Sequence, residues 1–362
     1  MIEVHDRPLI TFALFAYNQE KFIREAVEGA FAQTYSPLEI ILSDDCSSDG
    51  TFNVIQALTA AYRGPHKVLL NRNTHNLGLA AHINRVMELS SGELIVAAAG
   101  DDVSYPQRTS AIYDSWKADR RATYFYSKYE PISDAAVQEN LSRTRQTSKP
   151  GKECENLLLM IANCGPDIQG STEAWHRSIF DVFGSLPDEL LQEDRALPFR
   201  AILLGKLAYV DETLVKYRKH PRSIWGGLRC GYSQTFDENS RRRLIKLKQR
   251  LAIFNSFRSD LLLAMKKSLI AEDLARHALA TIEAGAKETR LQLAARSGSP
   301  VRRLSATLQL LLSRNNSTTS SFRASVAALL FAVFPALEKQ HFERARRRLA
   351  QQAQAGGSTS RL

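Results

Sequence analysis

Short apolar runs alternate with amphipathic segments four times within the first 100 residues of the chain. The apolar runs are residues 8–15, 38–42, 67–70 and 93–98. The segments between them, with apolar side chains at helical spacing, are residues 20–33, 51–62 and 79–89. This alternation predicts an α/β fold with a mostly parallel sheet, right-handed crossovers and flanking helices.

Polar side chains follow directly after each of these predicted strands. The four clusters are Tyr17-Asn18, Asp44-Asp45, residues 71–76 and Asp101-Asp102. Ligands of open parallel sheets bind beyond the carboxyl ends of the strands. The sequence therefore predicts a binding site at this edge of the sheet.

Charge is distributed unevenly along the chain. Residues 1–236 hold 25 Lys and Arg against 29 Asp and Glu, whereas residues 237–362 hold 23 against 9, a net charge of +14. The pattern predicts a near-neutral domain over residues 1–235, a basic helical region over 236–350 and a disordered tail over 351–362. A basic helical region suits an anionic membrane surface, nucleic acid, or a solvated bundle packed on the chain or on another copy.

Cysteine use and the chain ends favour a cytoplasmic protein. None of the four cysteines has CxxC spacing, so neither a zinc site nor a disulfide scaffold is expected. No signal-peptide pattern stands at the N-terminus. The apolar run between Arg323 and Glu338 is shorter than the roughly 20 residues that a spanning helix needs, so we expect no transmembrane helix.

Three acidic pairs and one basic run are candidates for chemistry, and each has a structural alternative. Asp101-Asp102 offers the oxygen ligands that Mg²⁺ and Mn²⁺ prefer, or it caps a helix near Pro106. Asp44-Asp45 can accept hydrogen bonds from a nucleobase or ribose, or form an Asx turn. Glu193-Asp194 begins a predicted helix, where acidic groups also pair with the helix dipole. The run 217–220 offers cations to a diphosphate, or is a basic surface turn.

Five segments, in order, resemble family 2 glycosyltransferases of the GT-A fold. They are ITFALFAYNQ and its continuation to Thr51, LNRNTHN to Arg108, GSTEAWHRSIFDVFG, QEDRALPFRAI and YRKH. The resemblance covers about residues 7–225. It implies a GT-A (Rossmann-like) fold and the transfer of a sugar from a nucleotide sugar with inversion at the anomeric carbon.

The resemblance also implies roles for individual residues. The implied nucleotide-binding residues are Tyr17, Asn18, Asp45, Arg72, Asn73 and Asp101. Asp102 and His220 resemble the ligands of a divalent metal, Mn²⁺ or Mg²⁺. Asp194 resembles the catalytic base, with Glu193 its neighbour. The implied acceptor-side residues are Gly170, Ser171 and Trp175.

Two departures from the family pattern bear on the reaction. Ala99 stands where many members have a further aspartate, and the QxxRW-type motif of processive synthases is absent, with only a faint echo at Arg222 to Trp225. Transfer of a single sugar is therefore expected. The implied donor is a UDP-sugar by preference, and the implied acceptor is a saccharide or lipid-linked saccharide in surface polysaccharide or glycolipid biosynthesis.

Other functions are weighed against this one. A catalytically inactive nucleotide-sugar-binding protein is disfavoured by the intact Asp102 and Asp194. Nucleic-acid binding through the basic region lacks a helix-turn-helix or RNA-recognition signature, and a nucleotidyltransferase lacks a glycine-rich phosphate loop. The expected partners are donor and acceptor, with no nucleic acid. We also expect peripheral association with the inner face of the cytoplasmic membrane through the basic region, and the sequence leaves homo-oligomers open.

Overall fold

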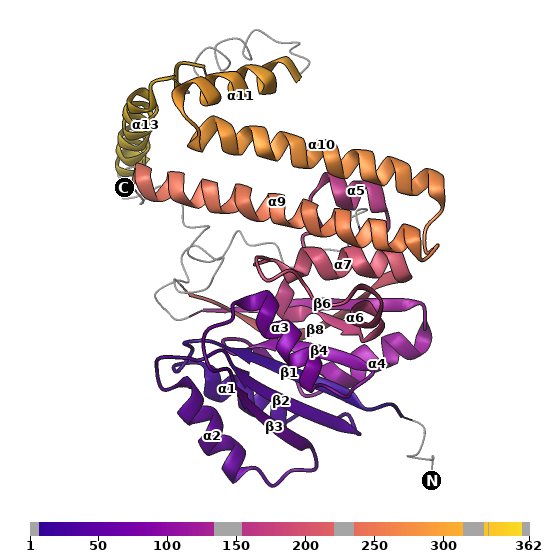
Figure 1. Ribbon diagram of the computed structural model, residues 1–362. Helices are drawn as coiled ribbons and strands as arrows, with labels where there is room; N and C mark the ends of the chain where they lie inside the picture. Colours follow the sequence, from indigo (N-terminus) through magenta and orange to yellow (C-terminus); the bar gives the residue numbers. More distant parts are fainter. Residues whose placement is uncertain (1–6, 134–153, 221–234, 314–328, 332, 357–362) are drawn as a thin grey trace. The chain divides into compact units, whose positions relative to one another are not determined.

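The computed structural model describes residues 7–133, 154–220, 235–313, 329–331 and 333–356 (Figure 1). They belong to two compact units. The first unit comprises Met1–Pro221 and Ala252–Ile282, and the second comprises Arg222–Leu251 and Glu283–Leu362. Sequence reasoning placed a domain boundary at residue 235, whereas the structure groups Ala252–Ile282 with the N-terminal residues.

The first 100 residues form four parallel strands joined by helices. The strands are β1 (Ile10–Ala16), β2 (Leu38–Asp44), β3 (Lys67–Arg72) and β4 (Leu94–Ala99), in the spatial order β3-β2-β1-β4. The helices are α1 (Ile23–Phe31), α2 (Thr51–Ala61) and α3 (Leu79–Leu89). The predicted alternation of strands and helices is confirmed.

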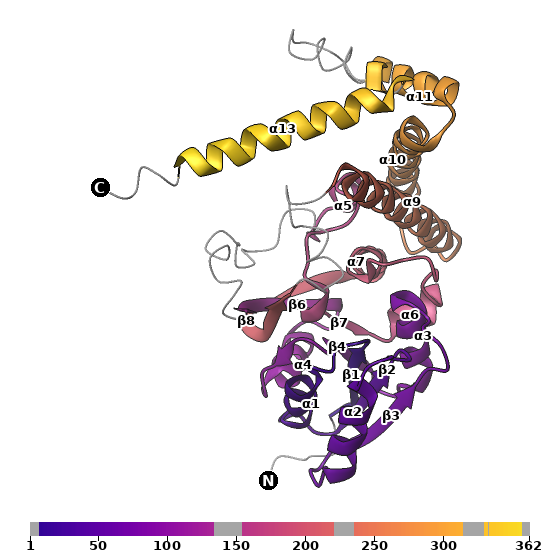
Figure 2. The same ribbon diagram turned by 90° about the vertical axis from the view of Figure 1, so that its left-hand side faces the viewer.

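Helices cover both faces of this sheet, which explains why β1 and β2 are apolar along almost their whole length (Figure 2). Phe12 and Leu14 of β1 belong to a core with side chains of α1, α2 and α4 (Arg108–Ala118). Phe15 points the other way, and its ring meets His82 of α3 edge-on. The sheet is thus buried between two layers.

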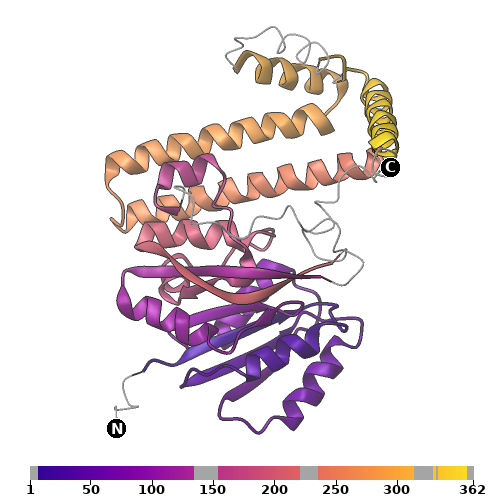
Figure 3. The ribbon, with the colours of Figure 1, turned by 180° about the vertical axis from the view of Figure 1, so that it is seen from behind.

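The second half of the sheet is mixed. It contains β5 (Val103–Ser104), β6 (Ala122–Ser133), β7 (Ala174–His176) and β8 (Lys206–Lys219), and the full order is β3-β2-β1-β4-β7-β6-β8-β5. β7 pairs antiparallel with both β4 and β6. Figure 3 shows the long strands β6 and β8 side by side, and they pair in parallel.

β8 differs from what the local sequence indicates. Residues 207–210 and 213–217 are each typical of a short strand, but the structure has one strand. Its pairing passes from Ser127–Val210 to Lys128–Thr213, so Asp211 and Glu212 form a bulge. The polar pair interrupts the ladder locally without ending the strand.

Short helices complete the first unit. They are α5 (Leu157–Ala162), the 3₁₀ turn η4 (Gly170–Thr172), α6 (Ser178–Phe183) and α7 (Glu193–Leu204). Pro198 lies inside α7 and is buried, although proline suits the first turn of a helix better than its interior. Proline has no N–H, so it cannot donate the helical bond to the carbonyl of Asp194. Packing of the apolar side chains around it outweighs that loss.

The C-terminal region is helical, as predicted. Its helices are α9 (Phe236–Lys266), α10 (Glu272–Ser297), α11 (Pro300–Ser313) and α13 (Pro335–Gly356). α13 includes residues 351–356 of the expected disordered tail, and residues 357–362 lie outside the described chain. Residues 134–151, whose polar composition indicates a loop, also lie outside the described chain, as does the faint QxxRW-like sequence at Arg222 to Trp225. Within the described residues no helix is long and apolar enough to cross a membrane.

Candidate active site

The predicted polar clusters meet at the carboxyl edge of the sheet. The register pairs Phe15 with Ala99 and Ala16 with Asp44, so the residues that follow β1, β2 and β4 leave the sheet side by side. Backbone bonds continue this alignment past the strand ends. Asp45 N–H donates to the carbonyl of Ala16 at 2.9 Å, and Asn73 N–H donates to that of Asp44 at 2.9 Å.

Asp45 organises the loop after β3. Its Oδ1 accepts from Asn73 Nδ2 and from the Leu77 N–H, both at 2.8 Å, and its Oδ2 accepts from the Gly78 N–H at 3.0 Å. Asp45 is 3% exposed and Asn73 8%. Asp45 and Asn73, predicted separately, are therefore one hydrogen-bonded unit.

Asp44 and Asp49 have structural roles: Asp44 forms the Asx turn considered as an alternative for this segment, and Asp49 bonds to the start of α2. Asp44 Oδ2 accepts from the Ser47 N–H at 2.9 Å, which is an Asx-type turn. Asp49 Oδ1 accepts from the Thr51 N–H at 3.0 Å where α2 begins. Arg72 lies with Nε 3.5 Å from Asp44 Oδ2 and its guanidinium 4.7 Å from the centre of the Phe52 ring.

Tyr17 and Asn18 shape the loop after β1. The backbone of Asn18 has φ of 53°, a left-handed conformation that asparagine tolerates better than most residues. Asn18 Oδ1 accepts from the Ser48 N–H at 2.8 Å, which joins this loop to the one after β2. Tyr17 is 48% exposed, so its ring is open to a ligand at this edge.

The end of β8 holds the Asp101-Asp102 pair. β8 pairs antiparallel with β5, which returns residues 218–220 to residues 101–102. Arg218 N–H donates to Asp102 Oδ1 at 2.7 Å, and His220 Nε2 lies 2.8 Å from Asp101 Oδ2. Arg218 is 8% exposed, so this residue of the run 217–220 is not a solvated cation of a surface turn. Asp101-Asp102 does not cap α4 either, because that helix begins after Gln107.

The turn η4 lies between the two acidic pairs. A Cβ placed on Gly170 would lie 2.6 Å from Oε1 of Glu193, so only glycine leaves this carboxyl its position. The next residue, Ser171, is close enough to Asp102 for its hydroxyl to lower the pKa of the Asp102 carboxyl. Two acidic pairs 91 positions apart in the sequence thus lie close to adjacent residues of one turn.

Trp175 is placed differently from the acceptor-side prediction. It is completely buried in β7, and its Nε1 lies 3.4 Å from Met87 Sδ. Its indole therefore supports the strand behind η4 and has no exposed surface for an acceptor in this structure. Gly170 and Ser171 remain the acceptor-side candidates.

Burial shifts the acid–base behaviour of the site. Burial raises the pKa of Glu193 to about 8, and the adjacent charge of Asp194 adds to the effect. Burial and the charge of Asp101 raise the pKa of Asp102 to about 8, against the lowering effects of the Arg218 N–H, Ser171 and Arg108. The site therefore carries less negative charge near neutral pH than its number of carboxyl groups suggests.

Sequence reasoning missed a buried network beneath these carboxyl groups. Arg108 is fully buried, and its Nη2 donates to the carbonyls of Ala97 at 2.6 Å and Glu173 at 3.2 Å. The Glu173 carboxyl accepts from the Tyr124 hydroxyl at 2.6 Å, and burial raises its pKa well above the ordinary value. Arg108 thus ties β4, which leads to Asp101, to the segment that follows η4. The signal in the sequence that could have revealed this network is Arg108 itself, a single arginine among the apolar residues of the buried face of α4.

A second missed network supports Asp45 from behind. Asn73 Oδ1 accepts from Asn71 Nδ2 at 3.0 Å, and Asn71 Nδ2 also donates to Ser43 Oγ at 2.9 Å. Ser43 Oγ lies 2.6 Å from Nε2 of the buried His82. Burial lowers the pKa of His82, so the neutral imidazole is the form that bonds to Ser43. The chain of bonds runs from α3 to the loop after β3.

The donor set around Asp101 fits a divalent cation that also binds a diphosphate. Mg²⁺ and Mn²⁺ commonly take only one or two protein carboxylates, and substrate phosphates and water supply the rest. Asp101, Asp102 and His220 provide two carboxylates and one imidazole. Within the described residues, no group of three or more His, Cys, Asp or Glu side chains is already arranged as a metal cage.

Residues 11–166 match the family described as glycosyl transferase family 2. The resemblance found in the sequence is therefore confirmed. The structure also has the expected fold class, an α/β sheet with flanking helices followed by a helical C-terminal region.

Relatives of the family 2 domain occur in several bacteria. An uncharacterized protein of Mycobacterium tuberculosis is 27% identical over 216 residues, which are 58% of this chain and 58% of that protein. EpsE of Bacillus subtilis, whose name describes a glycosyltransferase, is 34% identical over 101 residues, 28% of this chain and 36% of EpsE. The chain thus spans less than two thirds of the length of these curated relatives.

Solved structures also resemble the chain. The mannosyltransferase PcManGT from Pyrobaculum calidifontis, in complex with GDP-Man and Mn²⁺, is 17% identical with a TM-score of 0.48. The likeness covers 93% of this chain and 88% of PcManGT.

Proposed function

We propose that this chain transfers one sugar from a nucleotide sugar to an acceptor hydroxyl, with inversion at the anomeric carbon. The observation that carries the proposal is the meeting of Asp101-Asp102 and Glu193-Asp194 at Gly170 and Ser171. Single displacement needs charge compensation for the leaving diphosphate and a base on the opposite side of the reacting carbon. In this proposal the two acidic pairs, each close to one residue of the same turn, supply these two functions.

The donor nucleotide binds at the carboxyl edge of β1 and β2. Tyr17 stacks on the base, while Asp45 and Asn73 bond to base or ribose. Asn18 and Arg72 hold the two neighbouring loops. Asp45 already accepts three hydrogen bonds, and a carboxylate has about four acceptor sites, so one remains for the nucleoside. A UDP-sugar is the preferred donor.

Asp102 and His220 hold a divalent cation together with the donor phosphates, and Asp101 orients His220. A bound Mn²⁺ or Mg²⁺ would neutralise the charge of the departing diphosphate. Arg218 fixes this arrangement, since it binds the backbone carbonyl of Asp101 at 3.0 Å and the carboxyl of Asp102 through its N–H.

Asp194 is the general base in this proposal. Its neighbour Glu193, whose pKa burial raises to about 8, is protonated more readily near neutral pH than an ordinary glutamate. Gly170 and Ser171 face the acceptor, a saccharide or lipid-linked saccharide of surface polysaccharide or glycolipid synthesis. A cytoplasmic location follows from the cytoplasmic supply of nucleotide sugars.

The test is release of nucleoside diphosphate from a panel of UDP-, GDP- and dTDP-sugars with Mn²⁺, with and without saccharide acceptors. The wild-type chain should turn over donors of one nucleotide, and Asp194→Asn should lose about 10³-fold or more of that rate while still binding the nucleotide. Near-normal turnover by Asp194→Asn would refute the assignment of the base. Binding without any turnover by the wild type would favour an inactive nucleotide-sugar-binding protein.

A further inference from the structure

Helix α11 presents an apolar stripe to solvent. Val301, Leu308 and Leu312 are spaced seven and four residues apart, which places them on one face of the helix. Their exposed fractions are 79%, 43% and 84%. Single exposed leucines are common in soluble proteins, but an aligned stripe on one short helix is characteristic of an interaction surface.

The stripe is not the side by which α11 packs in its own unit. Ala306 and Thr307, on the opposite side of the helix, are 4% and 7% exposed. The helix therefore already has a buried face, and the stripe is a second apolar face.

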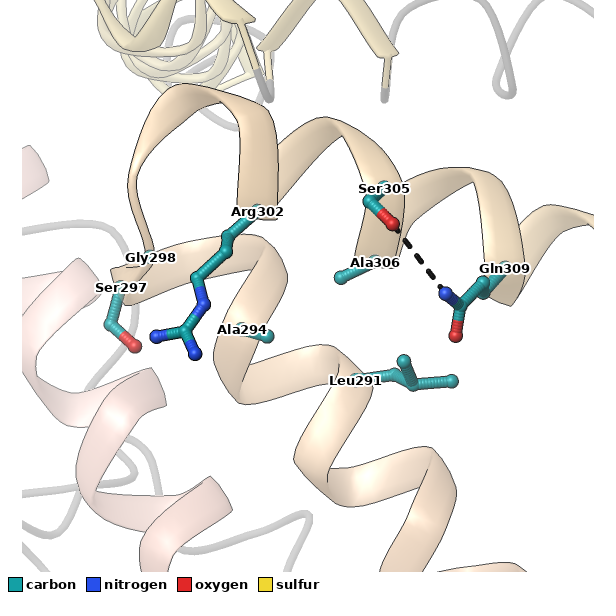
Figure 4. A pocket seen from close by; sticks show the side chains of 8 residues that line it. All are labelled: Leu291, Ala294, Ser297, Gly298, Arg302, Ser305, Ala306 and Gln309. Carbon is teal, nitrogen blue, oxygen red and sulfur yellow. Dashed lines mark hydrogen bonds between the residues drawn. The ribbon is translucent and has the colours of Figure 1, made fainter.

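A hollow with an apolar floor and a cationic rim lies between α10 and α11 (Figure 4). Leu291 and Ala294 of α10 and Ala306 of α11 form the floor. Arg302 extends over one end near Ser297, and Ser305 and Gln309 line the other end. This order of polarity matches a phospholipid, whose phosphate would meet Arg302 and whose acyl carbons would lie on the floor.

The charge of the region favours an anionic occupant. Residues 237–362 carry a net charge of +14, and α13 exposes Arg344 and residues 346–348. Each Lys or Arg near an anionic leaflet contributes about 1 kcal/mol to binding. A second copy of the chain would bring the same positive charge against this face, so repulsion disfavours self-association there.

We propose that α11 docks on an anionic lipid bilayer, with Val301, Leu308 and Leu312 inserted at headgroup level and Arg302 on a lipid phosphate. This inference goes beyond the proposed function, because it requires neither nucleotide nor turnover. It specifies which part of the basic region meets the membrane.

The test is flotation of the full chain with vesicles of phosphatidylglycerol and phosphatidylcholine in equal parts, and with phosphatidylcholine alone. The wild type should bind the mixed vesicles and lose binding as salt is raised. Val301→Ser/Leu308→Ser/Leu312→Ser should weaken binding about tenfold or more, and Arg302→Gln should weaken it selectively on anionic vesicles. The matched control is Leu159→Ser/Leu262→Ser/Leu274→Ser, which changes three exposed leucines of the first unit and should bind like the wild type.

Light scattering after size exclusion gives the second readout. An unchanged mass in the α11 variant, with vesicle binding lost, supports the proposal. Unchanged vesicle binding would overturn the proposal. If the variant also changes from a dimer to a monomer, the stripe is a contact with a second copy of the chain. If it instead unfolds at a lower temperature, the stripe packs within the chain.

Discussion

Nε2 of His220 lies 2.8 Å from Oδ2 of Asp101, although the two residues are 119 positions apart. The contact results from the antiparallel pairing of β5 with β8, which turns the end of β8 back over the loop after β4. Phe22 packs on the His220 ring at a centroid distance of 4.9 Å and fixes it from the other side. His220 is therefore held as part of the Asp101-Asp102 site.

Replacement of His220 tests whether this contact serves donor binding. His220→Ala should weaken nucleoside diphosphate binding in the presence of Mn²⁺ about tenfold, because one candidate ligand and the orienting bond to Asp101 are lost. Isothermal titration gives the affinity. His75→Ala, which removes an imidazole from an exposed loop position, is the control. Equal affinities of the His220 variant and the wild type would remove His220 from the site.

Glu193 should make stability depend on pH. Its folded-state pKa of about 8 lies above the ordinary value of 4.5, so its contribution is fully present below pH 4.5 and is lost as pH rises through about 8. The glutamine of Glu193→Gln cannot ionise. In this variant the unfolding temperature should therefore fall less steeply than in the wild type as the pH rises from about 6 to about 8.5. Glu212→Gln, at an exposed carboxyl of the β8 bulge, should leave the slope unchanged. A wild-type slope in Glu193→Gln would contradict this account.

The bond between Ser43 and His82 should show strong coupling. His82→Phe leaves the buried Ser43 hydroxyl without its imidazole partner and should cost about 1–3 kcal/mol of unfolding free energy. Ser43→Ala/His82→Phe removes both polar partners and should recover part of that loss. Denaturant unfolding of the two single variants and the double variant measures the coupling. Strictly additive losses would show that the two side chains do not interact.

The buried ion pair between α7 and α9 should dominate the stability of the first unit. Arg200 Nε lies 2.9 Å from Asp260 Oδ2, with side chains 2% and 6% exposed, and Phe199 stacks on Phe257 beside them. Asp260→Ala leaves a buried guanidinium without its counter-ion and should cost about 3–5 kcal/mol in denaturant unfolding. Asp273→Ala, at an exposed pair on α10, should cost less than about 1 kcal/mol. Similar losses in both variants would refute the pair's structural role.

Local pattern was enough to predict the parallel half of the sheet. The strands up to β4 are apolar because helices cover both faces, and α3 was predicted with the bounds that the structure has. The polar clusters could be placed together because parallel strands end at the same edge. Asp45 and Asn73 were therefore predicted at one site from strand ends alone.

The rest depends on pairing between distant residues, which periodicity does not encode. β7 has only three residues, and its antiparallel place between β4 and β6 leaves no local signal. Trp175 resembled an acceptor contact by its place in a motif, but its burial follows from that pairing. Arg108 and Glu173 were missed because a buried charge is recognised only when its partners are known.

Thermal unfolding with UDP, GDP or dTDP, each with Mn²⁺ or with EDTA, tests the central claim most directly. A ligand that binds only the folded chain raises its unfolding temperature. We predict a rise with one of the three nucleotides in the presence of Mn²⁺, abolished by EDTA and by Asp102→Asn. No rise with any of them in a folded sample, or a rise that persists in both EDTA and Asp102→Asn, would contradict a metal-assisted nucleotide-sugar site at Asp101-Asp102.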